Sequence, residues 1–211
     1  SNFTAKRIKK YWGRSSLVIH PPVDIKKFSP KKSRDDFYLS VSRLVPNKRI
    51  DLLVKAFNQL DLPLVIVGNG PEKKQLMKIA KRNISFLNYQ DDLAVKNLME
   101  KCKAFVYAGT EDFGIAPVEA MAAGAPVIAI KKAGILDTVN CINSKNKIPT
   151  GIFFNNQSER DLRECINFFE EKKLWLEFSS EDINLWAHNF SIENFKDKFS
   201  NFIDKSLSEY K

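Results

Sequence analysis

Short apolar runs that alternate with helix-like segments constrain the fold of this chain more than any other feature of its sequence. The apolar runs lie within residues 36–44, 62–70, 84–90, 103–109 and 125–130. The segments between them place apolar residues at helical spacing, over residues 49–60, 71–82, 92–102 and 117–124. The runs are continuously apolar, which is typical of strands covered on both faces of a parallel sheet. The pattern therefore predicts an α/β fold with a doubly wound parallel sheet.

The composition suits one large globular domain, or one domain with extensions, because 211 residues of which 44% are hydrophobic can bury a substantial core. No apolar run approaches the roughly 18 residues of a membrane span, and the basic start of the chain does not resemble a signal peptide. The three cysteines form no CxxC pair and no histidine lies at ligand spacing, so we expect reduced thiols, no metal site and a cytoplasmic protein.

The net charge of +9 is compatible with nucleic acid, an anionic membrane surface or a phosphorylated ligand as the partner. The lysines are scattered along the chain, and no aromatic residues are regularly placed as they are in RNA-binding motifs. We therefore expect no nucleic-acid partner, while a peripheral contact with an anionic membrane stays open. A basic surface without any binding role accounts for the charge equally well.

The loop that follows the first predicted strand carries the first sign of an anionic ligand. In an open α/β sheet, ligands bind outside the carboxyl ends of the strands. Arg43, Lys48 and Arg49 place three positive charges in this loop, immediately before a predicted helix. Guanidinium and ammonium groups bind phosphate, and a helix N-terminus adds free N–H groups. The loop suits a diphosphate, and the alternative is an ordinary solvated loop.

Two acids flank a Phe-Gly pair in the loop after the predicted strand 103–109. Glu111 precedes that pair, and Glu119 follows it in a helix that we expect to begin at about Pro117. The helix dipole alone would explain an acid in the first helical turn, but it does not explain Glu111. Because a carboxylate can accept hydrogen bonds from two hydroxyls, the two acids suit the diols of sugar and ribose rings. Together with the basic loop, they predict a nucleotide-sugar ligand.

The segment EDFGIAPVEAMAAGAPVIA resembles the E-x7-E motif of retaining glycosyltransferases of the GT-B fold, specifically family 4, the glycosyl transferases group 1. The segment SVSRLVPNKRIDLLVKAFNQL resembles the phosphate-binding Arg/Lys segment of that family, and IPTGIFF and NFSIENF resemble its later landmarks. The likeness runs from about residue 15 to residue 202. Within the family, VPNKRIDLLVKAFNQL is most similar to members that transfer mannose from GDP-mannose.

The resemblance implies a role for each residue of the predicted site. It implies that Arg43 and Lys48 grip the donor diphosphate and that Glu111 contacts the hydroxyls of the donor sugar. These three residues are the expected catalytic residues. Glu119 is expected to hold the ribose hydroxyls.

The resemblance also implies that the backbone of Phe113, Gly114 and Ile115 approaches the donor sugar and its phosphate. The chain departs from the family pattern in two places. Arg49 stands where the family often has Gly, and AGILDTV stands where a Gly-Gly and a Glu are common, which leaves Asp137 as the candidate replacement for that Glu. These departures bear on the identity of the donor more than on the type of reaction.

Members of the family usually need no metal, because Arg, Lys and helix dipoles stabilise the departing diphosphate. The chain has no DxD motif, which agrees with that expectation. We therefore expect no cofactor and no metal. The expected donor is a nucleotide-diphospho-sugar, with GDP-mannose as one candidate, and the expected acceptor is a glycan or a lipid-linked molecule.

A GT-B enzyme has two Rossmann-like domains, and this chain resembles one of them. The resemblance divides the chain into the end of an acceptor domain, a linker, the nucleotide-sugar donor-binding domain and a C-terminal crossing helix, at residues 1–14, 15–30, 31–180 and 181–211. It implies that the N-terminal acceptor domain is missing, and that this chain binds a donor but transfers no sugar alone. It also implies a cytoplasmic enzyme of polysaccharide biosynthesis, peripheral at the inner face of the membrane.

The flanking regions carry weaker patterns. They predict helices over residues 1–12 and 158–171, a short strand leading into a Pro-Pro linker over 16–24, a surface loop over 140–150 and an edge strand over 151–156. The tail from residue 182 to residue 211 has an amphipathic helical stripe. The stripe consists of Trp186, Phe190, Phe195, Phe199, Phe202 and Ile203.

Two other functions stay open besides glycosyl transfer. A nucleotide-sugar epimerase of the same fold would need further acid/base residues, and the histidines of the chain are His20 in the linker and His188 in the tail. A non-catalytic module would bind anionic ligands through its positive face. Binding of a nucleotide-sugar separates both enzymes from the module, and transfer to an acceptor separates the transferase from the epimerase.

Overall fold

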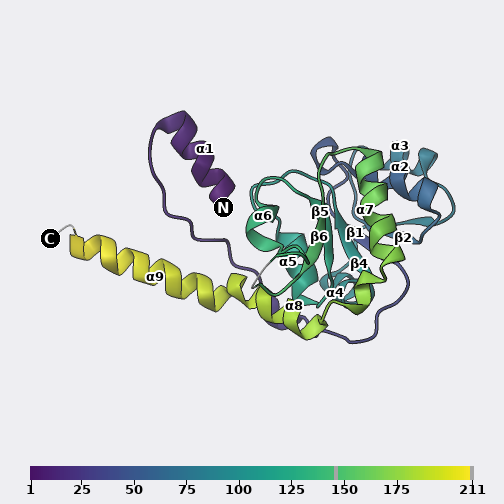
Figure 1. Cartoon of the computed structure of the whole chain (residues 1–211). Helices are drawn as coiled ribbons and strands as arrows, with labels where there is room; N and C mark the ends of the chain where they lie inside the picture. The colour runs from purple at the N-terminus through teal and green to yellow at the C-terminus, as the bar shows by residue number, and fades with distance from the viewer. Residues whose placement is uncertain (145–146, 210–211) are drawn as a thin grey trace.

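The computed structural model describes residues 1–144 and 147–209, and within them the core is a six-stranded sheet (Figure 1). All strand pairs are parallel, in the order β3-β2-β1-β4-β5-β6. The strands are β1 (Tyr38–Val41), β2 (Leu64–Val67), β3 (Ile84–Leu87), β4 (Ala104–Tyr107), β5 (Val127–Ile130) and β6 (Gly151–Phe154). The chain reverses its direction of travel across the sheet between β1 and β4, which is the switch point where such sheets bind ligands. The predicted doubly wound α/β fold is confirmed, and β6 is an edge strand as expected.

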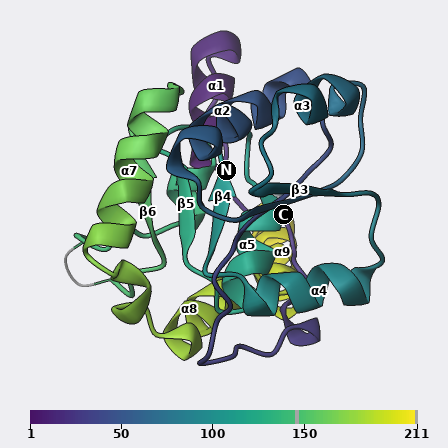
Figure 2. The ribbon, with the colours of Figure 1, turned by 90° about the vertical axis from the view of Figure 1, so that its right-hand side faces the viewer.

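Helices cover both faces of the sheet, as Figure 2 shows. One face carries helices that pack on one another, namely α2 (Ile50–Leu60), α3 (Lys73–Ile79) and α7 (Glu159–Glu171). The opposite face carries α4 (Asp92–Lys101), α5 (Ile115–Ala122), the single turn of α6 (Ile135–Thr138) and α8 (Ser180–Ala187). Because both faces are covered, the strands are buried on both sides, which explains their continuously apolar sequences.

Tyr38 shows how β1 is anchored in the core. Its ring packs edge to face on Phe57 of α2 and on Phe169 of α7, with ring centroids 5.2 and 6.2 Å apart. All three side chains are fully buried, and burial of each contributes about 1.5–3 kcal/mol to stability. This packing anchors the start of β1 in the core.

Two helices begin at residues other than the expected ones. Helix α5 begins at Ile115 rather than at Pro117. Proline is tolerated as the third helical residue because the first four N–H groups of a helix have no partner within the helix. Helix α3 begins at Lys73, and Pro71 lies in the preceding turn, where the N–H of Glu72 donates to the carbonyl oxygen of Leu44 at 3.2 Å.

The expected strand within residues 16–24 is wrong. The structure has only an isolated bridge there, between Val23 and Ser191, and the N–H of Val23 donates to the carbonyl oxygen of Phe190 at 2.8 Å. Leu17 is 67% exposed. The segment is apolar enough for a strand, but none of the six strands pairs with it.

The two ends of the chain project from the α/β body (Figure 1). They form α1 (Asn2–Trp12) and α9 (Ile192–Glu209), and neither helix contains a buried residue. Helix α1 touches the body through the N–H of Asn2, which donates to Asp137 at 2.6 Å, and through an ion pair between Arg7 and Asp112 at 3.1 Å.

The expected single tail helix is divided into two. Helix α8 is followed by a 3-10 turn, η4 (His188–Phe190), and Ser191 adopts an extended conformation before α9 begins. The hydroxyl of Ser191 accepts a hydrogen bond from the N–H of Asn194 at 3.1 Å, as an N-cap does. The stripe is therefore split: Phe190 is buried, whereas Phe199 in α9 is 47% exposed.

Residues 145–146 of the expected surface loop and residues 210–211 of the expected tail helix lie outside the described residues. A further 3-10 turn, η3 (Leu174–Leu176), joins α7 to α8.

Candidate functional site

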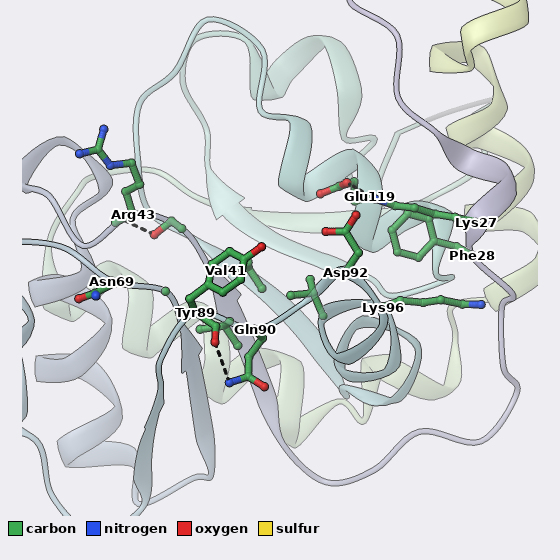
Figure 3. Close-up of a pocket in the computed structure, with 14 residues that line it drawn as sticks. Lys27, Phe28, Val41, Arg43, Asn69, Tyr89, Gln90, Asp92, Lys96 and Glu119 are labelled. Atoms are coloured by element: carbon green, nitrogen blue, oxygen red, sulfur yellow. Dashed lines mark hydrogen bonds and ion pairs between the residues drawn. The ribbon is translucent and has the colours of Figure 1, made fainter.

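Two neighbouring cavities lie along the carboxyl edge of the sheet. The first, which we call the β2 cavity, has a volume of about 420 Å³ and is drawn in Figure 3. It is lined by the ends of β1 and β2, the loop after β3, α4 and the residues Lys27, Phe28 and Glu119. The second, which we call the β4 cavity, has a volume of about 650 Å³ and is lined by the loops after β1 and β4 and by the start of α5. Both cavities include Val41 and Ser42 at the end of β1, so they meet at the switch point.

The loops at this edge pack backbone against backbone. Gly68, which follows β2, has a φ angle of 140°, and a Cβ atom there would lie 1.9 Å from the carbonyl oxygen of Ser42. Only glycine fits, because it accepts a positive φ angle and has no side chain. The close approach places the loops after β1 and β2 together on the wall of the β2 cavity.

The β4 cavity contains an ion pair between Lys48 and Glu111. Lys48 ends the 3-10 turn η2 (Pro46–Lys48), and Glu111 lies in the loop between β4 and α5. Their side chains are only 21% and 25% exposed. Burial lowers the pKa of the Lys48 ammonium. The structure therefore brings the predicted phosphate-binding lysine and the predicted sugar-binding acid into one cavity.

Arg43 lines the β2 cavity rather than the β4 cavity. Its side chain is exposed, and among the residues that the structure describes its guanidinium has no hydrogen bond or ion pair. Figure 3 shows the guanidinium directed away from Glu119. Arg43 and Lys48 were predicted to grip one diphosphate, and in this arrangement such a ligand would span the boundary between the two cavities.

Glu119 lines the β2 cavity and pairs with a lysine that the sequence analysis did not identify. The ammonium of Lys27, at the end of η1 (Ile25–Lys27), lies 3.0 Å from Oε1 of Glu119. Because α5 begins at Ile115, Glu119 is beyond the first helical turn, and the helix dipole does not account for it. No local signal in the sequence indicates which acid Lys27 meets, since the two residues are 92 positions apart.

The Phe-Gly pair has two separate roles at the start of α5. The ring of Phe113 is buried against those of His20 and Phe190, with centroids 5.6 Å from each. Gly114 is the N-cap of α5 with a φ angle of 93°, and Ile115 is 52% exposed. All three predicted residues line the β4 cavity. The first N–H groups of α5 and the positive end of its dipole thus lie at the site where Glu111 and Lys48 meet.

Asp137, the candidate replacement for the family glutamate, lines neither cavity. Burial disfavours its charge, but hydrogen bonds from the N–H of Asn2 at 2.6 Å and from the ring of His20 at 3.1 Å lower its pKa. In this structure Asp137 ties α1 and the linker to α6.

Tyr89, Tyr107 and Thr110 are among the lining residues that the sequence analysis did not single out. Tyr89 is 81% exposed beside the β2 cavity (Figure 3). It lies in one of the loops at the carboxyl edge of the sheet, and this position is the sequence feature that could have identified it as a candidate site residue. Tyr107 and Thr110 line the β4 cavity, at the end of β4 and in the loop after it. Tyr107 belongs to an apolar run, so the sequence predicts that it is a core residue.

Over residues 1–144 and 147–209, no cluster of three or more His, Cys, Asp or Glu side chains has an arrangement that could hold a metal ion. Within the same residues, no helix combines the length and the apolar character needed to span a bilayer.

The comparisons with known proteins agree with this geometry. The family model described as glycosyl transferases group 1 matches residues 23–182, a segment that includes every strand and both acids of the site. An uncharacterized glycosyltransferase of Methanocaldococcus jannaschii is 30% identical over 79% of this chain and 47% of its own length. A GDP-mannose-dependent monoacylated alpha-(1-6)-phosphatidylinositol monomannoside mannosyltransferase of Corynebacterium glutamicum is 32% identical over 66% of this chain and 45% of its own length.

The chain spans about half the length of these curated relatives. Among solved structures, Anabaena HepE in complex with UDP superposes with a TM-score of 0.82, at 21% identity, over 97% of this chain and 62% of its own. That likeness supports the fold alone. The sequence match extends over most of the chain and includes Lys48, Glu111 and Glu119, so the chain belongs to the glycosyl transferases group 1 family.

Proposed function

We propose that this chain is the donor-binding half of a retaining glycosyltransferase. The enzyme transfers a hexosyl group, mannosyl or glucosyl, from a nucleotide-diphospho-sugar to a glycan or lipid-linked acceptor. The observation that carries the proposal is the pair of cavities at the switch point, each of which holds one lysine–glutamate pair. Each cavity thus has an anion-binding group and a diol-binding group side by side.

The two cavities suit the two ends of a nucleotide-sugar. The nucleoside would occupy the β2 cavity, where the Glu119 carboxylate can accept hydrogen bonds from both ribose hydroxyls. The sugar would occupy the β4 cavity beside Glu111, and the diphosphate would lie between them, near Lys48. Arg43, with no partner among the described residues, could turn onto the same diphosphate.

The chemistry follows from where charge develops. As the bond between the sugar and the diphosphate breaks, negative charge accumulates on the departing phosphate. Lys48, Arg43 and the N–H groups at the start of α5 would stabilise that charge without a metal. The acceptor hydroxyl must also be held against the anomeric carbon. We infer that the acceptor domain supplies this positioning, so this chain alone would bind the donor without transferring sugar.

The assignments of the sugar, the nucleotide and the pathway rest on the relatives and on the resemblance of the sequence to the family. The Corynebacterium relative is named for its dependence on GDP-mannose, whereas the Anabaena structure contains UDP. We propose a mannosyl or glucosyl donor on that basis, with the enzyme acting in polysaccharide biosynthesis in the cytoplasm, at the inner face of the membrane. An epimerase is less well supported, because neither His20 nor His188 lines the β2 or the β4 cavity.

Calorimetry with this chain tests the proposal directly. The ligands are GDP-mannose, UDP-glucose, GDP, UDP and the two free nucleosides. We expect one nucleotide-sugar and its diphosphate to bind, with Glu119→Gln weakening both. The matched control is Glu164→Gln, which alters an exposed acid of α7 that pairs with Arg160. Absence of binding by every nucleotide would overturn the proposed function.

A further inference from the structure

Tyr107 has a buried hydroxyl that is not paired. The residue ends β4 and is 4% exposed. Among the described residues, no group forms a hydrogen bond with its hydroxyl oxygen, and the same holds for the hydroxyl of Thr110 three residues later. Buried polar groups without partners destabilise a fold, and most proteins avoid them. Two such hydroxyls in the lining of one cavity therefore point to a ligand.

The position of these hydroxyls indicates which part of a ligand they meet. Tyr107 ends the strand next to β1, at the switch point. The loop after β4 runs directly against the loop after β1, because a Cβ atom on Gly109 would lie 3.3 Å from the carbonyl oxygen of Asn47 and from Cα of Lys48. The two hydroxyls therefore line the same cavity as the Lys48 ammonium.

The three groups share one chemistry, since the ammonium and both hydroxyls can donate hydrogen bonds. Burial raises the pKa of the Tyr107 phenol above its ordinary value, so the phenol keeps its proton at neutral pH. A cluster of donors with one positive charge complements an anionic oxygen that only accepts hydrogen bonds. A sugar hydroxyl, which also needs an acceptor for its own proton, is better matched by the Glu111 carboxylate.

We propose that Tyr107 and Thr110 donate hydrogen bonds to phosphate oxygens of the nucleotide-diphospho-sugar, beside Lys48, and so take part in donor recognition. This inference rests on the proposed function and adds two recognition residues to it. The hydroxyls have no partner among the described residues, and the phosphate oxygens of the donor would supply one. These hydroxyls thus lower the stability of the free chain and raise its affinity for the donor.

The proposal has a consequence that a structural role would not have. The substitution Tyr107→Phe removes one oxygen atom and keeps the ring that packs at the end of β4. It should raise the melting temperature of the free chain, because an unpaired buried hydroxyl disappears, and it should weaken diphosphate binding at the same time. Thr110→Val, which keeps the shape of the side chain, should act in the same two directions.

The experiment compares the whole chain with Tyr107→Phe, Thr110→Val and the control Tyr11→Phe, which alters an exposed tyrosine on α1. Melting temperature is measured without ligand. Calorimetry then measures Kd for UDP, GDP, UDP-glucose, GDP-mannose and the two nucleosides. We expect Tyr107→Phe to weaken nucleoside diphosphate and nucleotide-sugar alike by about tenfold or more, with nucleoside affinity and the control unchanged.

The outcomes separate this inference from the proposed function. If the unaltered chain binds nucleoside diphosphate and Tyr107→Phe binds it equally well, the inference is wrong and the proposed function stands. A loss confined to nucleotide-sugars would assign the hydroxyls to the sugar and overturn the phosphate assignment. A lower melting temperature for Tyr107→Phe would show that the hydroxyl is already paired in the free chain, which also overturns the inference. If the unaltered chain binds no nucleotide, both proposals fail together.

Discussion

Replacement of Lys48 by methionine tests how the ion pair of the β4 cavity works. A charge-assisted hydrogen bond to phosphate contributes about 1.5–3 kcal/mol, which corresponds to roughly a 10- to 150-fold change in Kd. Lys48 also neutralises Glu111, which is 25% exposed in the same cavity. Two unit charges about 4 Å apart near a protein surface interact by about 4 kcal/mol. The bare Glu111 carboxylate would therefore repel the diphosphate, and because the two effects add, we expect Lys48→Met to weaken binding by considerably more than about 100-fold.

The repulsion can be separated from the lost hydrogen bond. In the double variant Lys48→Met/Glu111→Gln the cavity loses both charges, so only the direct contact with phosphate is missing. We expect this variant to bind nucleoside diphosphate about tenfold more weakly than the unaltered chain, and thus more tightly than Lys48→Met. Calorimetry with UDP and GDP measures all three affinities. Lys55→Met serves as the control, because Lys55 lies on α2 outside both cavities and pairs with Asp51.

Two results would refute this reasoning. Unchanged diphosphate affinity in Lys48→Met would show that the lysine does not contact the phosphate. A double variant that binds more weakly than Lys48→Met would show that Glu111 does not repel the diphosphate, and that the ion pair has no electrostatic role in binding.

Three further predictions concern the acids, the metal and the fold. In an enzyme that joins this chain to an acceptor domain, Glu111→Ala should lower turnover and leave the affinity for the free nucleotide unchanged. Glu119→Ala should lower turnover and the nucleotide affinity together. If the two variants have identical effects on turnover and on affinity, this division of roles is wrong. The chain alone should bind its nucleotide-sugar equally well with a chelator present and should transfer no sugar to an acceptor, as assayed with radiolabelled donor. Arg34→Met should lower the free energy of unfolding in urea by about 2–4 kcal/mol, because the partly buried guanidinium donates to the carbonyl oxygens of Cys102 and Ala123 at 3.0 and 2.9 Å.

The Arg34 prediction has a control variant on α7, and the predictions on metal and sugar transfer each have an outcome that would contradict them. Arg160→Met removes an exposed arginine whose partner is Glu164 on the same helix, and it should leave the urea midpoint unchanged. A decrease in donor affinity on addition of the chelator would show that a metal takes part, and efficient transfer by the chain alone would show that it needs no acceptor domain. An Arg34→Met variant as stable as the unaltered chain would mean that these carbonyl groups find other partners.

Local sequence determined the elements of this fold to a large extent. The continuously apolar runs became the parallel strands, and the segments at helical spacing became α2, α3, α4 and α5. Both properties depend on residues that are close in the sequence, since they reflect the side-chain period of a helix or a strand. The same local character explains the errors. Residues 16–20 are apolar like a strand but have no partner strand, and Ser191 caps a new helix inside a continuous amphipathic pattern.

The sequence also placed the candidate site at the carboxyl edge, because the loops after parallel strands must gather at one edge of the sheet. It identified Arg43, Lys48 and Glu111 as charged residues of those loops, and Glu119 as an acid of the helix that follows one of them. It did not indicate that Lys48 pairs with Glu111 while Arg43 lines a different cavity.

Only the tertiary structure decided which charges meet and which groups stay unpaired. Lys27 reaches Glu119 across 92 positions, and the hydroxyl of Tyr107, in an apolar strand, lies in the wall of the β4 cavity without a partner among the described residues. Both features depend on the strand order β2-β1-β4, which brings the loops after these strands side by side. Strand order results from the packing of helices on both faces of the whole sheet, and no local pattern of residues encodes it.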